Sequence, residues 1–289
     1  MRSMPFLLFV FATGPVAPAD QSPEKPLTPE EQYKALAEEF TRAARGLWEA
    51  KTDEDRAKSA AEGAKLPARF VELAEKDPAG SLAQTVLVNA VTAEIWLENN
   101  TSHPGFGKES PEDRALALLL RHHLGSDGLA EACRRISYGF RKDGETFLRA
   151  VVEKSPHREV RGAACLRLAQ FLNRRRQRME LVQGNPEMAA RYRGLFGSEY
   201  LEELQRRDRA RVEEEVIALF ERAAAEYGEV KLTWEGSVAE RSRSELFEIR
   251  HLSPGKEAPE IEGMDQDGKG FKLSDYRGKV VLLYFWSET

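Results

Sequence analysis

Few residues of this 289-residue chain combine a reactive type with a useful spacing. Its two cysteines, Cys133 and Cys165, are 32 positions apart and form no Cys-x-x-Cys pair. Each lies among Ala and Leu residues in a helix-like stretch, which predicts a small buried hydrophobe. Nothing nearby would lower a thiol pKa, so we expect neither to act as a nucleophile. The spacing leaves open a disulfide between them, which would need Cα atoms about 4.4–6.8 Å apart.

The five histidines form no metal-binding pattern. His122 and His123 are adjacent, so on a helix they point about 100° apart and do not chelate one ion as an i, i+4 pair would. His103, His157 and His251 have no nearby cysteine or second histidine. The sequence also lacks a glycine-rich phosphate loop and a Gly-x-Ser-x-Gly motif. We therefore assign no catalytic, cofactor-binding or metal-binding residue and expect no cofactor.

The strongest signal is a series of short elements near the C-terminus. Two partly apolar runs, 260–265 and 270–273, flank Asp267-Gly268, which predicts a hairpin because glycine accepts a positive φ. Ser274 is expected to cap a short turn that ends at Gly278. Residues 280–286 are seven consecutive apolar residues without alternation. Such a run predicts a central strand that is covered on both faces.

This order of elements resembles the opening of a thioredoxin-like redoxin domain of the AhpC/TSA superfamily, and it is most similar to the TlpA/ResA branch of thiol-disulfide oxidoreductases. The resemblance covers about residues 254–289. The residues that carry it are Gly255-Lys256-Glu257-Ala258-Pro259, Asp267-Gly268-Lys269, Leu273-Ser274-Asp275-Tyr276-Arg277-Gly278-Lys279 and Val280-Val281-Leu282-Leu283-Tyr284-Phe285-Trp286. Trp286 and Ser287 depart from the proline-containing pattern of peroxiredoxins, so a peroxidase with a single peroxidatic cysteine is the less favoured alternative.

The resemblance implies a catalytic motif that this sequence does not contain. In the TlpA/ResA branch, three residues and then Cys-x-x-Cys follow the Phe-Trp pair, so the nucleophilic cysteine would come directly after Thr289. The sequence is then a fragment, and protein thiols and disulfides are the implied partners. Tyr284 and Trp286 would flank the site. Without the remainder of the domain, 280–286 would be an exposed apolar strand and an aggregation hazard.

Residues 1–19 are expected to be a secretory signal peptide. Arg2 precedes a short apolar core at 5–12, and Ala17-Pro18-Ala19 provides a cleavage site. The apolar core is far shorter than the ~20 residues that span a bilayer, and we expect no stable membrane span. We expect an exported protein of the periplasm, cell envelope or extracellular space, where thiol–disulfide exchange has substrates. The net charge of −5 gives no support for nucleic-acid binding.

Residues 28–250 are expected to form a helical domain after a proline-rich linker at 20–27. Thr28-Pro29-Glu30-Glu31 is a capping box with proline at the first helical position. Five apolar residues then share one helical face: Tyr33, Leu36, Phe40, Ala43 and Leu47. Further helices are expected to begin near Pro67, Ser81, Ser110-Pro111, Ser126, Gly144, Pro156, Asn185-Pro186 and Ser198. The basic run 174–178 is expected to be a solvated helix face or a helix end.

Weak self-similarity within the helical domain is typical of a repeat. Phe40, Phe147 and Phe220 each begin a Phe-x-Arg-Ala pattern. This favours an α-hairpin array of the TPR or HEAT kind, which would leave an extended surface for a protein partner; a compact helical bundle is the alternative. The expected fold class is mostly α, followed by a truncated α/β thioredoxin-like domain at 251–289. Two functions stay open: an exported thiol-disulfide oxidoreductase, and a non-catalytic helical interaction module.

Overall fold

Helices dominate the structure, a computed structural model that describes residues 26–101, 110–265 and 267–284. The predicted signal peptide at 1–19, His103 and Trp286 lie outside the described residues. Two short antiparallel hairpins interrupt the helical pattern late in the chain. The fold is therefore mostly α with a partial α/β domain at its C-terminal end, as predicted from the sequence.

The helices follow one another with short connections. The first seven are α1 (Pro29–Glu49), α2 (Asp53–Gly63), α3 (Leu66–Ala74), α4 (Ser81–Asn100), α5 (Pro111–His122), α6 (Leu129–Ile136) and α7 (Lys142–Lys154). The next five are α8 (Arg158–Val182), α9 (Pro186–Phe196), α10 (Ser198–Arg206), α11 (Arg209–Tyr227) and α12 (Val238–Phe247). A π-helical turn, Glu248–Leu252, extends α12.

Local sequence signals explain where these helices begin. The Thr28 hydroxyl accepts a hydrogen bond from the Glu31 amide (3.2 Å), and the Glu31 carboxylate accepts one from the Thr28 amide (2.8 Å). Ser110 and Asp113 form the same reciprocal pair at the start of α5. Each box satisfies two amides that have no partner within the helix. The predicted capping box and the predicted helix starts at Ser81, Pro111, Pro186 and Ser198 are confirmed.

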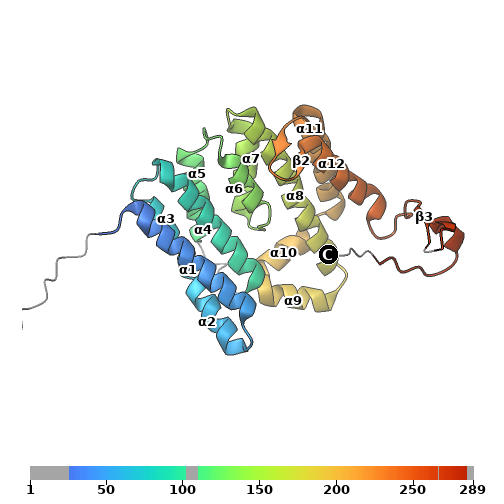
Figure 1. The fold of residues 1–289 in the computed structure, drawn as a ribbon, viewed down its shortest axis with the longest axis horizontal. Helices are drawn as coiled ribbons and strands as arrows, with labels where there is room; N and C mark the ends of the chain where they lie inside the picture. The colour runs from blue at the N-terminus through green and yellow to red at the C-terminus, as the bar shows by residue number, and fades with distance from the viewer. Residues whose placement is uncertain (1–25, 102–109, 266, 285–289) are drawn as a thin grey trace, which may run out of the picture.

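Along the long axis of the molecule, α1 to α5 lie toward one end and α11 and α12 toward the other, with α6 to α10 between them (Figure 1). Sequence neighbours pack as pairs, including α1 with α2, α3 with α4, and α11 with α12. This is the arrangement expected of stacked α-hairpins. One continuous apolar core nevertheless runs through the stack, from Leu36 of α1 to Ile249 of the π-helical turn.

Helix α8 is the centre of this arrangement, and it corrects one prediction. It packs against α6, α7, α9, α10, α11 and α12. The basic run 174–178 lies in its middle, and the Arg175 and Arg176 side chains are only 1% and 7% exposed. Arg175 pairs with Glu145 of α7, and Arg176 pairs with Glu213 of α11 (3.1 Å). The run is therefore not a solvated face, because carboxylates on neighbouring helices pair with it inside the protein.

A small hairpin connects α11 to α12. Its strands, β1 (Lys231–Leu232) and β2 (Gly236–Ser237), pair antiparallel. The turn places Trp234 at φ 66, an uncommon conformation for a bulky residue. Glu235 fixes the turn to α8 through two hydrogen bonds from Arg167, of 2.6 and 3.0 Å. The hairpin is thus attached to the helical body by a charged pair.

Candidate functional site

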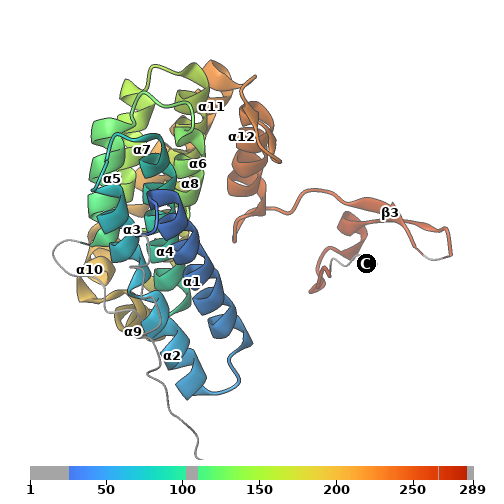
Figure 2. The ribbon, with the colours of Figure 1, turned by 60° about the vertical axis from the view of Figure 1, so that its left-hand side comes forward.

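The C-terminal segment leaves the helical body after the π-helical turn and stands apart from it (Figure 2). It contains strands β3 (Glu262–Met264) and β4 (Gly270–Lys272) and a 3₁₀ turn, Leu273–Tyr276. The strands pair antiparallel, with Gly263 opposite Phe271. The hairpin that the sequence predicts around Asp267-Gly268 is therefore present.

Asp265 organises the hairpin turn. Its Oδ1 accepts hydrogen bonds from the amides of Asp267 (3.0 Å) and Lys269 (2.9 Å). Its backbone carbonyl accepts one from the Gly268 amide (3.0 Å). Gly268 has φ 77, which glycine adopts without a Cβ clash. An Asp–x–x–Gly loop of this kind closes through its own side chain.

The 3₁₀ turn is capped differently from the prediction. Ser274 lies inside the turn, so the prediction that it caps the turn is wrong. The cap is instead formed by Asp275, whose Oδ2 accepts a hydrogen bond from the Lys272 amide (3.1 Å). The Ser274 amide donates to Glu260 Oε1 (3.0 Å), which joins the turn to a residue two positions before β3. Gly278, at φ 81, ends the turn as predicted.

Residues 280–284 differ most from their prediction. They form no strand in the structure, and Val280 and Leu282 are 104% and 91% exposed. The predicted central strand needs parallel neighbours and helices on both faces. The described residues include one two-stranded hairpin in this segment and no helix that covers it. The apolar run therefore lies exposed, and Tyr284 does not face a catalytic group among the described residues.

The two cysteines are buried free thiols on different helices, Cys133 on α6 and Cys165 on α8. Burial raises the pKa of Cys133 to about 12, and Arg167 opposes this only in part. Burial likewise raises the pKa of Cys165 to about 11. A thiol needs a lowered pKa to attack a disulfide at neutral pH. Burial therefore keeps both thiols protonated, whereas a nucleophilic cysteine must be a thiolate.

Three of the described histidines, His123, His157 and His251, make structural contacts. His123 Nε2 lies 2.8 Å from the Pro78 carbonyl oxygen, and His157 Nε2 lies 2.8 Å from that of Gly125. The His251 ring stacks on Phe247 at 4.9 Å. Within the ranges that the structure describes, no group of three or more His, Cys, Asp or Glu residues could hold a metal ion. In the same ranges, no helix is long and apolar enough to cross a bilayer.

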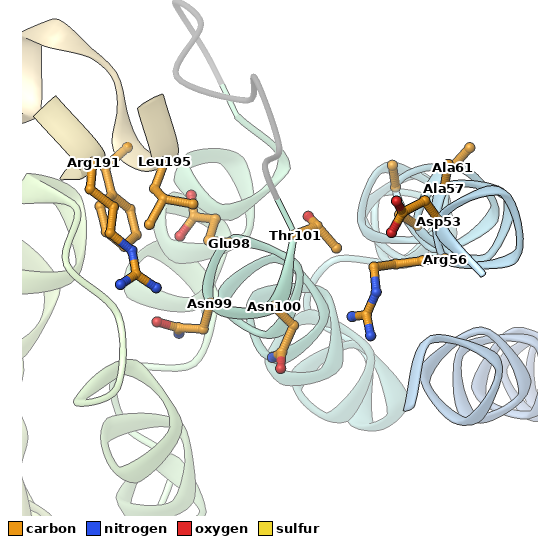
Figure 3. Close-up of a pocket in the computed structure, with 13 residues that line it drawn as sticks. Asp53, Arg56, Ala57, Ala61, Glu98, Asn99, Asn100, Thr101, Arg191 and Leu195 are labelled. Atoms are coloured by element: carbon orange, nitrogen blue, oxygen red, sulfur yellow. The ribbon is translucent and has the colours of Figure 1, made fainter. Parts of the chain in front are cut away.

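A pocket of about 670 Å³ lies between α2, the end of α4 and α9. Figure 3 shows Arg56 on α2 and Arg191 on α9 on opposite sides of it. The polar side chains at the end of α4 are already engaged: those of Asn99, Asn100 and Thr101 each donate to a carbonyl four residues earlier, at 2.8 Å. The pocket lining contains no cysteine, histidine or serine. The pocket therefore offers no thiol, imidazole or serine hydroxyl among its lining residues.

The sequence did not predict the buried acid cluster beneath this pocket. It is made up of five carboxyl groups around Arg141: Glu94 and Glu98 of α4, Glu112 and Asp113 of α5, and Asp143 of α7. One local signal was available. Glu94 lies in a mostly apolar stretch at 90–97 of a helix with apolar residues on nearly every face, which indicates a buried carboxyl group. No local pattern, however, links it to Arg141.

The comparison with protein families gives one result, and it falls on the C-terminal segment. Residues 254–289 match the model of the AhpC/TSA family. No curated protein and no solved structure matches the chain significantly. The match covers the hairpin, the 3₁₀ turn and the apolar run described above. Residues 254–289 are therefore part of a thioredoxin-like redoxin domain of the AhpC/TSA family.

Proposed function

We propose that the protein is an exported thiol-disulfide oxidoreductase of the TlpA/ResA kind, in which a helical domain at 28–250 carries a redoxin domain that begins at about residue 251. The family match at 254–289 is the observation that supports this most directly. The Phe285-Trp286 pair and the absence of the peroxiredoxin proline favour a thiol-disulfide oxidoreductase over a peroxidase. The signal-like residues 1–19 support export.

The proposed chemistry uses cysteines that follow Thr289 in a longer protein. A thiolate, stabilised at a helix N-terminus, attacks one sulfur of a substrate disulfide. This forms a mixed disulfide and releases one substrate thiolate. The second cysteine then attacks the mixed disulfide and releases the other. The dithiol loses two electrons and two protons and becomes a disulfide, while the substrate disulfide gains both as two thiols.

The environment of the two cysteines in this chain supports that placement. Cys133 and Cys165 are buried, and burial raises both thiol pKa values, so neither presents a thiolate to a protein substrate. The apolar residues 280–284 follow the hairpin and the 3₁₀ turn, after Gly278 and Lys279. A cysteine a few residues later would follow this run, as the resemblance requires.

The experiment compares two proteins. The reading frame downstream of the Thr289 codon is determined, and both the longer product and the 289-residue chain are purified. We expect an in-frame Cys-x-x-Cys and insulin reduction by the longer product with dithiothreitol as electron source. We expect no cysteine-dependent turnover by the 289-residue chain. Peroxide consumption without insulin reduction would instead support the peroxidase alternative. A reading frame without cysteine would overturn the proposal.

A second function is a non-catalytic helical interaction module. It is favoured by one observation, which is that the helical body has its own continuous core from Leu36 to Ile249. Stacked α-hairpins of this kind present extended surfaces to other proteins. Two results together would support an interaction module. Residues 26–253 and the 289-residue chain would capture the same partner, and the downstream reading frame would contain no Cys-x-x-Cys.

A further inference from the structure

The buried acid cluster has more carboxyl groups than cations. Arg141 Nε donates to Glu98, and the Arg141 guanidinium lies 3.8 Å from Glu94, 3.6 Å from Glu112 and 3.9 Å from Asp113. Four carboxyl groups from two helices thus converge on one cation at the start of a third. Arg141, Glu94 and Glu112 have side chains that are 9%, 2% and 1% exposed.

Among the described residues, charges on the surrounding elements do not balance this excess. Arg178 of α8 acts on Glu98 through space, but it also donates to the Tyr200 hydroxyl (3.3 Å) and lies over the Phe140 ring. Lys142 of α7 acts on Asp143. Glu145 of α7 pairs with Arg175 of α8, and Asp53, Arg56 and Arg191 line the pocket together with Glu98.

Several carboxyl oxygens in the cluster also lack a hydrogen-bond donor. Both oxygens of Glu112 and Glu98 Oε2 are buried and accept no hydrogen bond from the described residues. An ionised carboxylate in such a place loses its hydration without compensation, whereas a protonated carboxyl group loses far less. The geometry therefore favours the neutral form of part of the cluster, independently of any titration argument.

We propose that the buried acid cluster binds protons and thereby acts as a pH-sensitive latch between α4, α5 and α7. When Glu94 and Glu112 are protonated, the latch is closed and the three helices pack around Arg141. When they ionise, uncompensated negative charge in the core loosens this junction. The cluster forms the wall of the pocket at Glu98, so opening of the latch also changes the pocket.

The direction of the pH effect follows from the folded-state environment. Burial, and then the charge of Glu98, raise the pKa of Glu94 to about 7. Burial raises the pKa of Glu112 well above its usual range, and burial followed by Asp113 raises that of Asp143. The folded state therefore holds more protons than the unfolded state. The contribution of Glu94 to stability is fully present below about pH 4.5 and is lost as the pH rises through about 7.

The test measures urea unfolding of the 289-residue chain at pH 5.5, 7.0 and 8.5. Each extra proton held by the folded state changes the unfolding equilibrium constant by about tenfold per pH unit between the two pKa values. We expect Glu94→Gln and Glu112→Gln each to remove part of this slope and to be more stable than the wild type at pH 8.5. Histidine titration is common to all variants and cancels in the comparison.

Glu153→Gln is the matched control, because Glu153 is an exposed glutamate on α7. We expect it to keep the wild-type slope. Hydrogen exchange, corrected for intrinsic rates, is expected to be faster in α4 and α5 at pH 8.5 than at pH 5.5 in the wild type but not in the Glu94→Gln variant. Identical pH slopes for the wild type and both Gln variants would overturn the proposal. If one variant fails to fold, the pH slope of the other variant and the pH dependence of hydrogen exchange in the wild type test the proposal.

Discussion

At the scale of single residues, burial determines what the reactive groups of this chain can do. Cys133 and Cys165 would be the obvious nucleophiles by type, yet burial holds both thiols in their protonated form. Arg175, a surface residue by type, is among the most deeply buried large side chains. Residue type alone therefore predicts the wrong role for the two cysteines and for Arg175.

We expect the two thiols to be nearly unreactive in the folded chain. A pKa of about 12 or about 11, compared with about 8.5 for a free thiol, reduces the thiolate fraction at pH 7.5 by a factor of about 100 or more. Ellman's reagent should therefore detect both thiols in guanidinium and almost none in buffer. Rapid native labelling that the Cys133→Ala variant abolishes would contradict the assignment of Cys133 as buried.

We expect Arg175→Ala to destabilise the protein by about 3–5 kcal/mol, because it leaves the Glu145 carboxylate in the interior with fewer partners. Arg206→Ala is the matched control, since Arg206 also pairs with a glutamate, Glu202, but at the surface. Its loss should cost at most about 1 kcal/mol. Urea unfolding measures both. Equal losses would show that Arg175 is not the buried partner described here.

At the scale of elements, the sequence predicted what depends on neighbours along the chain. The capping box at Thr28 and the hairpin at Asp267-Gly268 each close within five residues, so their signals are local. The acid cluster was missed because Arg141 lies 43 positions from its partner Glu98. The exposure of residues 280–284 was predicted for a chain without the rest of the domain, but the predicted strand is absent, since a strand pattern specifies a strand only when pairing partners are present.

The exposed apolar run should make the 289-residue chain associate with itself. We expect Val280→Lys/Leu282→Lys to reduce light scattering and dye binding by 8-anilinonaphthalene-1-sulfonate, because two charges interrupt an unpaired apolar edge. Ala210→Lys/Ala225→Lys adds the same charge at exposed positions of α11 and serves as the control. An equal reduction by the control would mean that net charge, and not the apolar run, governs association.

At the scale of the whole molecule, the chain consists of a self-contained helical body and an attached C-terminal segment. The apolar core ends at Ile249, before the redoxin segment begins. Figure 2 shows that this segment extends away from the helices. Folding of the body should therefore not depend on it.

We expect removal of residues 254–289 to leave the helical circular dichroism unchanged and to shift Tm by no more than about 2 °C, which for a body of this size corresponds to less than about 1 kcal/mol. Removal of residues 238–289 is the comparison, because it also deletes the core residues Val238, Leu246 and Ile249. That deletion should lower Tm by many degrees. A large loss in the shorter deletion would show that the segment supports the body.

The connection between the two parts has a consequence for reaction rates. Residues 253–256 join the body to Glu257, which pairs with Arg277 of the segment, and four residues reach at most about 14 Å. A tether of that length keeps its two ends at an effective concentration in the millimolar range. A molecule bound to the body would therefore meet the redoxin domain about as often as if it were present at millimolar concentration in solution. Under the proposed function, even weak binding to the helices would then favour the bound molecule as a substrate.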